Sequence, residues 1–431
     1  AGWAAAALLR AGPRCPAWTW AGCGPLPQRH LGCGRRQPGR SRRRSHDERT
    51  GEAGAGSAMK AAQALEAEVA AVLGGSCGVP RGEPALLLLC VSGGADSVAL
   101  LLLADKVARQ WPSWRLEVLH FNHGLRPEAE AEQAFVCGLA ESRGLPCHVR
   151  RAAPGSLKGR GGLQDLARKW RRREAAALLE ARSASYGGLP SSAVLLAHHL
   201  DDQVETQMLK LIRGAHLARL SGMRPRDGIF VRPLLGVPKA RLIAYLRSQG
   251  QPWMEDASNA KPVYQRNKIR LELLPLLAEL CGGKDALLRR FAAIGEQSRQ
   301  LAAWLDDACI AHGGSPYRPS EGEDGEEAEA EQEAAVAQEL PVGPAFSALP
   351  EMVRQELVWR FVASSTGSQL GCGAVRDILE AVSPCGEAGR GGGQSQAQRP
   401  WRWPLAGGWE LERRDGLLAA RPAAAAGSAD E

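Results

Sequence analysis

The chain has 431 residues, which is enough for two or three domains, and its 44% hydrophobic content is ordinary for a globular protein. It has no apolar window of the ~18 residues that a transmembrane helix needs, and its 11 scattered cysteines form no C-x-x-C pair, which argues against a zinc ribbon, an iron–sulfur site or a thioredoxin-type centre. Residues 1–58 alone account for the net charge of +7, and residues 59–431 are neutral in sum. That neutrality depends on the strongly acidic residues 321–339. Without this acidic segment, residues 59–431 have an excess of about nine positive charges, which is compatible with a nucleic-acid partner.

Residues 1–58 are rich in alanine, glycine, proline and arginine, and no acid precedes Asp47. This composition is similar to that of a transit peptide, so we expect a disordered leader that is removed from the mature protein. It favours delivery to an organelle, with the chloroplast ahead of the mitochondrion. The alternative is that Met59 is the true start, in which case the expected location is cytoplasmic.

The first strong pattern is an apolar run at residues 85–91, which predicts a strand buried on both faces. A second apolar run, residues 98–104, is typical of the first turns of a helix. The turn SGGADS lies between them, and its glycines, hydroxyls and amides suit a phosphate group, although a bare SGG suits a capped tight turn equally well. The carboxylate of this turn indicates a divalent cation beside the phosphate. The residues of the turn are Ser92, Gly93, Gly94, Ala95, Asp96 and Ser97.

Three further strands are predicted at residues 115–121, 146–151 and 193–197. Their alternation with helical segments predicts an α/β fold, a doubly wound, Rossmann-like parallel sheet with helices on both faces. Ligands of such sheets bind at the carboxyl ends of the strands. The segment HFNHGLR, residues 120–126, lies at such an end, which makes His123 a candidate site residue, although a histidine there can also be a solvated loop residue.

A predicted helix within residues 158–173 has one apolar stripe and a strongly basic opposite face. A solvated surface is the usual meaning of such a face. Here it follows a glycine-rich loop and places five bases within residues 168–173, which favours contact with a phosphate backbone. Arg168 and Lys169 are the candidates for this contact.

The last of these strands leads into HHLDDQVET, residues 198–206. Acids in the first turn of a helix are ordinary partners of the helix dipole. Three acids beside two histidines exceed what capping needs, and they suit a Mg²⁺ ion or a bound ammonium group. The members of this cluster are His198, His199, Asp201, Asp202 and Glu205.

The order of these motifs resembles the tRNA(Ile)-lysidine synthase family of PP-loop ATP pyrophosphatases. The resemblance rests on SGGADS, HFNHGLR, AHHLDDQVET, RGAHLARLSGM and VRPLL, and it is strengthened by WMEDASN at residues 253–259, RNKIR at residues 266–270 and LLPLL at residues 273–277. It covers about residues 84–280, with a weaker echo at residues 405–414.

This resemblance implies that ATP adenylates the wobble cytidine at its C2 position, on O2, in an isoleucine tRNA with a CAU anticodon. The ε-amine of free L-lysine then attacks C2, and the products are lysidine, AMP and pyrophosphate. The turn SGGADS would hold ATP, and Asp96 with Asp202 would hold Mg²⁺. His123, His198 or His199 would take the proton from the lysine amine.

The resemblance also implies partners for the remaining polar residues. Asp201 and Glu205 are candidates for the lysine ammonium group, and Arg266 and Arg270 are candidates for tRNA contact. Trp253 is a candidate for stacking on a base, although a core position is the commoner place for tryptophan. No membrane partner is implied, and the oligomeric state is left open, with a homodimer as one candidate.

The predicted organisation begins with the leader at residues 1–58 and a PP-loop ATP-binding catalytic domain at residues 59–280. A smaller, mainly helical substrate domain follows at residues 281–385, with a disordered acidic insertion at residues 321–339. Residues 386–431 are predicted to hold a low-complexity linker, a short β segment and a tail.

Three other functions compete with lysidine synthesis as interpretations of these motifs. A PP-loop tRNA 2-thiolase is the nearest, but that family relies on paired cysteines in a C-x-x-C motif that this chain lacks. A small-molecule adenylating enzyme, such as an NAD or GMP synthetase, needs neither the basic helix nor the WMEDASN segment. A non-catalytic RNA-binding relative is the third, and the intact SGGADS and HHLDDQVET motifs argue against it.

Overall fold

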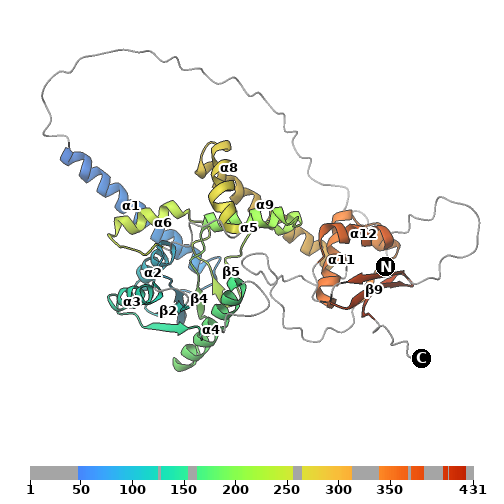
Figure 1. Ribbon diagram of the computed structural model, residues 1–431, viewed down its shortest axis with the longest axis horizontal. Coiled ribbons are helices and arrows are strands. Elements are labelled where there is room, and N and C mark those ends of the chain that lie inside the picture. The colour runs from blue at the N-terminus through green and yellow to red at the C-terminus, as the bar shows by residue number, and fades with distance from the viewer. Residues whose placement is uncertain are drawn as a thin grey trace, which may run out of the picture. The chain divides into compact units, whose positions relative to one another are not determined.

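The arrangement of helices and strands is seen in a computed structural model (Figure 1). It describes residues 47–124, 128–153, 163–255, 265–312, 339–366, 370–382, 401–405 and 407–423. Residues 1–46 of the predicted leader, nearly all of the predicted acidic insertion and the segment at residues 386–399 lie outside the described residues.

A six-stranded sheet with the strand order β3-β2-β1-β4-β6-β5 organises the larger part of the structure. The four strands that the sequence predicts are confirmed as parallel neighbours: β1 (Ala85–Cys90), β2 (Trp114–Asn122), β3 (Cys147–Arg151) and β4 (Ala193–Leu195). Two short strands were not predicted, because two residues carry no readable period: β5 (Arg226–Asp227) and β6 (Phe230–Val231). Strand β6 pairs parallel with β4, and β5 pairs antiparallel with β6 at the edge.

Helices cover both faces of this sheet, as the doubly wound prediction requires. Strand β1 is buried because its side chains alternate between two cores: Leu87 and Leu89 pack with α1, α2, α3 and α6, and Leu86 and Leu88 pack against α4 (Figure 1). The helices of this part are α1 (Asp47–Gly74), α2 (Ala95–Ala108), α3 (Ala129–Glu141), α4 (Leu163–Ser185), α5 (Leu200–Ile212), the short η1 (Leu217–Arg219) and α6 (Lys239–Ser248).

A second hydrophobic core lies in the smaller part of the structure, which combines helices with a four-stranded antiparallel sheet of order β7-β10-β9-β8. Strand β7 precedes the last three helices that the structure describes, yet it pairs with β10, which follows them. The predicted short C-terminal β segment is therefore one part of a sheet that the helices interrupt. The remaining elements of the chain, of which the π-helical turn and α8 pack against α5, are α7 (Gln265–Lys268), the π-helical turn (Ile269–Leu273), α8 (Leu274–Leu280), α9 (Lys284–Ala311), β7 (Glu339–Pro341), α10 (Pro344–Ser347), α11 (Glu351–Thr366), α12 (Cys372–Val382), β8 (Trp401–Leu405), β9 (Trp409–Arg414) and β10 (Leu417–Pro422).

The absence of a transmembrane helix and of a cysteine-based centre was expected from the composition, and two structural features bear on it. Within the described ranges, no helix is both long and apolar enough to cross a membrane. The cysteine side chains that the structure describes are free thiols.

A buried carboxylate, Glu117, ties β2 to α4. Its side chain is 1% exposed, and it accepts hydrogen bonds from Arg182 at 2.8 Å, from the hydroxyl of Tyr186 at 2.7 Å and from Nε2 of His148 at 2.7 Å. Burial alone would raise the pKa of Glu117, but these three partners outweigh it and lower that pKa to about 2. The ionised form is therefore the one that stabilises the fold.

The lowered pKa of Glu117 predicts a dependence of stability on pH. The stabilisation is complete above the ordinary pKa near 4.5 and is lost as the pH falls through about 2. We expect Glu117→Gln to lower the free energy of unfolding at pH 7 by about 3 kcal/mol and to flatten its decline below pH ~5. Denaturant titration at several pH values measures both. Glu130→Gln is the control, because the Glu130–Arg151 pair is exposed, and an equal loss in the two variants would contradict the prediction.

The loop that follows α5 depends on a glycine. The side chain of Gln203 donates to the carbonyl of Met223 at 2.8 Å and accepts from its amide at 2.6 Å. Gly222 has a φ of +79°, and a Cβ atom there would lie 2.4 Å from Oε1 of Gln203. Any larger residue at this position would strain the backbone and displace a buried amide that holds the loop.

We expect Gly222→Ala to lower the free energy of unfolding by about 2–4 kcal/mol, because backbone strain adds to the loss of two buried hydrogen bonds. Thermal or denaturant unfolding checks this. Gly228→Ala is a matched control: its φ is +57°, and no atom lies within 4 Å of the new Cβ, so it should show the strain alone. Equal losses in the two variants would mean that the Gln203 contact has no part in the effect.

Candidate active site

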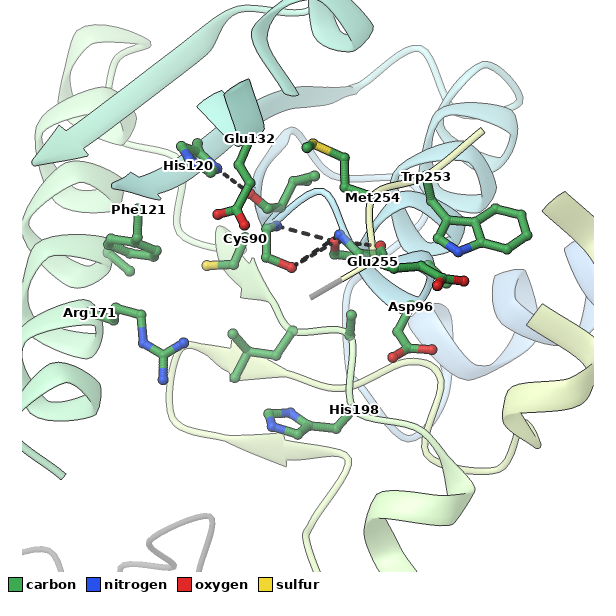
Figure 2. A pocket seen from close by; sticks show the side chains of 18 of the residues that line it. Cys90, Asp96, His120, Phe121, Glu132, Arg171, His198, Trp253, Met254 and Glu255 are labelled. Carbon is green, nitrogen blue, oxygen red and sulfur yellow. Dashed lines mark hydrogen bonds between the residues drawn. The ribbon is translucent and has the colours of Figure 1, made fainter. Parts of the chain in front are cut away.

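The turn between β1 and α2 lies at the centre of the site (Figure 2). Gly93 has a φ of +95°, which glycine adopts without strain, and its carbonyl accepts a hydrogen bond from the amide of Met254 at 2.9 Å. The hydroxyl of Ser97 accepts from the amide of Ser92 at 3.2 Å and donates to the carbonyl of Gly94 at 2.9 Å. These bonds hold the turn in one conformation, as a preformed phosphate-binding turn requires.

A cavity of about 920 Å³ lies at the carboxyl ends of β1, β2 and β4, which is the edge that the parallel sheet predicts. The turn, α4, α6 and residues 253–255 contribute to its walls, and Figure 2 shows Asp96, His198 and Arg171 around it. Basic side chains outnumber acidic ones in the lining, which suits a ligand with several phosphates. The charged lining consists of Arg168, Arg171, Arg172, Lys239 and Arg247 together with Asp96, Glu132 and Glu255.

Asp96 is held between Lys239 and His199. Its Oδ2 atom lies 2.9 Å from Nζ of Lys239 and 3.4 Å from Nε2 of His199. Burial alone would raise the pKa of Asp96, but His199 and Lys239 outweigh it and lower that pKa to about 2. Asp96 is therefore a carboxylate at neutral pH, as a ligand of a divalent cation must be.

Within the predicted cluster after β4, His199 lies among three carboxylates, those of Asp96, Asp201 and Asp202. This histidine is 2% exposed, its amide donates to Oδ2 of Asp202 at 3.0 Å, and its Nε2 lies 3.4 Å from both Asp96 and Asp202. Burial opposes a proton on the ring, but the surrounding carboxylates prevail and raise the pKa of His199. His199 does not line the cavity, so its geometry fits the positioning of Asp96 and Asp202.

Arg266 and Arg270 contact this same cluster. Glu205, which is 1% exposed, accepts from Nε of Arg266 at 2.8 Å and from Nε of Arg270 at 2.5 Å. Both guanidinium groups also approach Oδ1 of Asp202, at 3.4 and 3.2 Å. The structure thus places the two arginines, predicted for tRNA contact, in ion pairs with buried acids, and a contact with tRNA stays a prediction.

Asp201 has a structural position at the start of α6. Its Oδ2 atom accepts from the backbone amide of Lys239 at 2.9 Å, and its Oδ1 atom pairs with the ammonium group of Lys284. It thereby joins the first turns of α5, α6 and α9. Binding of the substrate's ammonium group by Asp201 stays a prediction, because both oxygens already have protein partners here.

The other predicted residues divide between the cavity and its surroundings. His123, His198 and Arg168 line the cavity, whereas Lys169 is exposed and outside the lining. His123 packs edge-on against Trp170 of α4, with ring centroids 5.3 Å apart. Of the WMEDASN segment, only the first three residues are described; Trp253 packs against the main core and also lines the cavity, so both readings of this tryptophan keep support.

Lys239 and His120 are examples of site residues that the sequence does not single out. Lys239 reaches Asp96 across 143 residues of chain, and the segment VPKAR around it has no motif that would signal this. His120 was noted only as part of HFNHGLR; it is 2% exposed, lines the cavity, and its Nδ1 donates to the carbonyl of Val91 at 2.9 Å. Because a carbonyl only accepts, the neutral ring carries its proton on Nδ1.

The carboxylates of Asp96 and Asp202 differ in how well they could bind a Mg²⁺ ion. Oδ1 of Asp96 is buried and has no hydrogen-bond partner in the described structure, which fits a metal ligand. Both oxygens of Asp202 already face His199, Arg266 or Arg270, so a metal there would first have to displace a partner. The described residues contain no group of three or more potential ligands. The residues thus fit an ion held by Asp96 together with substrate phosphates, which is a common way for proteins to bind Mg²⁺.

Known proteins similar to this chain include a PP-loop domain family and tRNA(Ile)-lysidine synthases. A family model described as a PP-loop domain matches residues 65–277. The tRNA(Ile)-lysidine synthase of Thermus thermophilus is 43% identical over 208 residues, which are 48% of this chain and 38% of that protein. The tRNA(Ile)-lysidine synthase of a Bradyrhizobium species is 35% identical over 295 residues, which are 66% of this chain and 75% of that protein.

Solved structures with a similar fold include the U34-tRNA thiolase NcsA from Methanococcus maripaludis, with 17% identity and a TM-score of 0.42 over 54% of this chain and 78% of that one. The lengths covered differ among the curated relatives. The chain spans well under half of the Thermus protein, at 38%, and three quarters of the Bradyrhizobium protein, at 75%.

Proposed function

Because the chain belongs to the tRNA(Ile)-lysidine synthase family, we propose that it converts the wobble cytidine of a CAU-anticodon isoleucine tRNA to lysidine, with ATP and free L-lysine as co-substrates. The observation that carries the proposal is that three features meet in one cavity. It combines the turn SGGADS, the ionised Asp96 and the basic wall of α4 at one edge of the sheet.

In the first step, O2 of the cytidine attacks the α-phosphorus of ATP, and the bond to the β-phosphate oxygen breaks. The fixed amides and hydroxyls of Ser92–Ser97 would stabilise the negative charge that develops on the leaving pyrophosphate. Asp96 would hold Mg²⁺, which neutralises phosphate charge when bound. His199 lies 3.4 Å from Asp96 and outside the cavity lining, so its contribution would be to position Asp96.

In the second step, the ε-amine of lysine attacks C2 and AMP leaves. The amine must first lose a proton, because the pKa of a free lysine side chain is about 10.4. His123 and His198 line the cavity, so they are better placed than the buried His199 to accept this proton. Besides Asp96, Glu132 and Glu255 are the carboxylates of the lining, and these two would attract the ammonium groups of the lysine.

The tRNA would approach along α4. Arg168, Arg171 and Arg172 of this helix line the cavity and could neutralise backbone phosphates near the anticodon loop. Arg172 is also anchored, at 2.9 Å from Asp227 and 4.0 Å above the ring of Phe230.

The test is a reconstitution with purified protein, ATP, labelled lysine and unmodified tRNA with a CAU anticodon. We expect lysine to be incorporated into the tRNA, with one AMP and one pyrophosphate released for each lysine. A tRNA with the same anticodon loop but C34 replaced by U is the control and should not be labelled. Pyrophosphate release that depends on a sulfur donor or on glutamine, and not on lysine, would overturn the proposal.

A further inference from the structure

Helix α6 contributes one face to the cavity. Lys239, Ile243 and Arg247 line it, and their spacing of four residues places them on the same side of the helix. The other side of α6 is buried in the main core through Leu242 and Leu246. The cationic groups of this face are therefore carried by a helix with a fixed position.

The cavity face of α6 is connected to the turn SGGADS at both of its ends. At its start, Nζ of Lys239 lies 2.9 Å from Oδ2 of Asp96, and the backbone amide of Lys239 is held by Asp201 at 2.9 Å. After α6, the amide of Met254 donates to the carbonyl of Gly93 at 2.9 Å. Ligands of the turn consequently lie beside Lys239.

The ammonium group of Lys239 has bonding capacity left over. An ammonium has three N–H donors, and the contact with Asp96 uses one of them. The side chain is 38% exposed, so solvent or a ligand can reach the group. Arg172, another cation of the lining, is held in a different way, since it is paired with Asp227 and packed on the ring of Phe230.

We propose that Lys239, supported by Arg247 on the same face of α6, binds the β- and γ-phosphates of ATP and stays bound to the pyrophosphate as it leaves. The inference rests on the proposed function for the identity of the ligand. Lys239 keeps its bond to Asp96 and donates its other two protons to phosphate oxygens, so no rearrangement of the turn is needed. As the bond to the α-phosphorus breaks, the charge that collects on the pyrophosphate strengthens these two contacts.

Calorimetric binding of inorganic pyrophosphate in the presence of Mg²⁺, with AMP as the reference ligand, tests this directly. We expect Lys239→Met to weaken pyrophosphate binding about tenfold or more and to leave AMP binding within about twofold of wild type. Lys239→Arg should recover most of the pyrophosphate affinity. Arg241→Gln is the matched control, because Arg241 is on the same helix but pairs with Glu68 outside the cavity lining; its pyrophosphate affinity should be unchanged.

A pyrophosphate affinity of Lys239→Met within twofold of wild type would overturn the inference, and so would an equal loss of AMP and pyrophosphate binding. Thermal unfolding of each variant confirms that the folded protein is being compared. The readout also separates the two proposals. If the wild-type protein makes no lysidine but Lys239→Met still weakens pyrophosphate binding, the proposed function fails and the phosphate site stands. If the wild-type protein makes lysidine but Lys239→Met binds pyrophosphate as tightly as wild type, the proposed function stands and the phosphate site fails.

Discussion

Asp96→Asn is expected to lower the rate of ATP-dependent lysine transfer to tRNA by about a thousandfold, because it removes the only turn carboxylate. Asparagine keeps the shape and can still bond to its neighbours. It cannot supply the negative charge that Asp96 carries at neutral pH, where its pKa of about 2 keeps it fully ionised. Pyrophosphate release and label incorporation, measured at saturating ATP, distinguish a chemical defect from weakened binding.

A matched variant shows whether the loss belongs to the site. Asp105 is on the same helix α2, is 5% exposed, and pairs with Arg109 and Arg143 away from the cavity lining. Asp105→Asn therefore makes the same change of charge and should reduce stability while leaving the activity of the folded fraction near wild type. Retention of activity within tenfold by Asp96→Asn would remove Asp96 from the catalytic assignment.

The parts of the site that local sequence predicts are those built by one strand and the turn after it. The run at residues 85–91 reads as a buried strand because every side chain of β1 meets a core, and the glycines of SGGADS mark the turn directly. The cluster at residues 198–206 follows the same logic after β4. Parallel strands then bring both segments to one edge of the sheet, so their proximity follows from the fold class alone.

What local sequence does not predict are the partners of these groups. Lys239 and Asp96 are 143 residues apart, and Arg270 and Glu205 are 65 residues apart. A basic residue in RNKIR looks the same in sequence whether it faces tRNA or a buried acid, because the pattern records charge and not direction. Likewise, HHLDDQVET does not distinguish His198, which lines the cavity, from His199, which is buried behind it.

The ion pairs of Arg270 lead to the second large expected effect. Its guanidinium group bonds to Glu205 through Nε at 2.5 Å and through Nη2 at 2.8 Å, and it reaches Asp202 at 3.2 Å. Burial opposes the charge of Arg270, but the bonds to Glu205 prevail and raise the pKa of Arg270. We expect Arg270→Met to cost about 3–5 kcal/mol of unfolding free energy, because it leaves the buried Glu205 with Arg266 as its remaining cation in the described network.

A double-mutant cycle separates the ion pair from a direct role in tRNA binding. Adding Glu205→Gln to Arg270→Met should restore part of the lost stability, because the buried charge that was left with Arg266 alone is gone. The salt dependence of tRNA binding provides the second measurement. If Arg270 acts through Glu205 and Asp202, the slope of affinity against salt stays at its wild-type value in Arg270→Met, since no phosphate contact is lost. A slope reduced by about one, without a change in stability, would instead assign Arg270 to a tRNA phosphate.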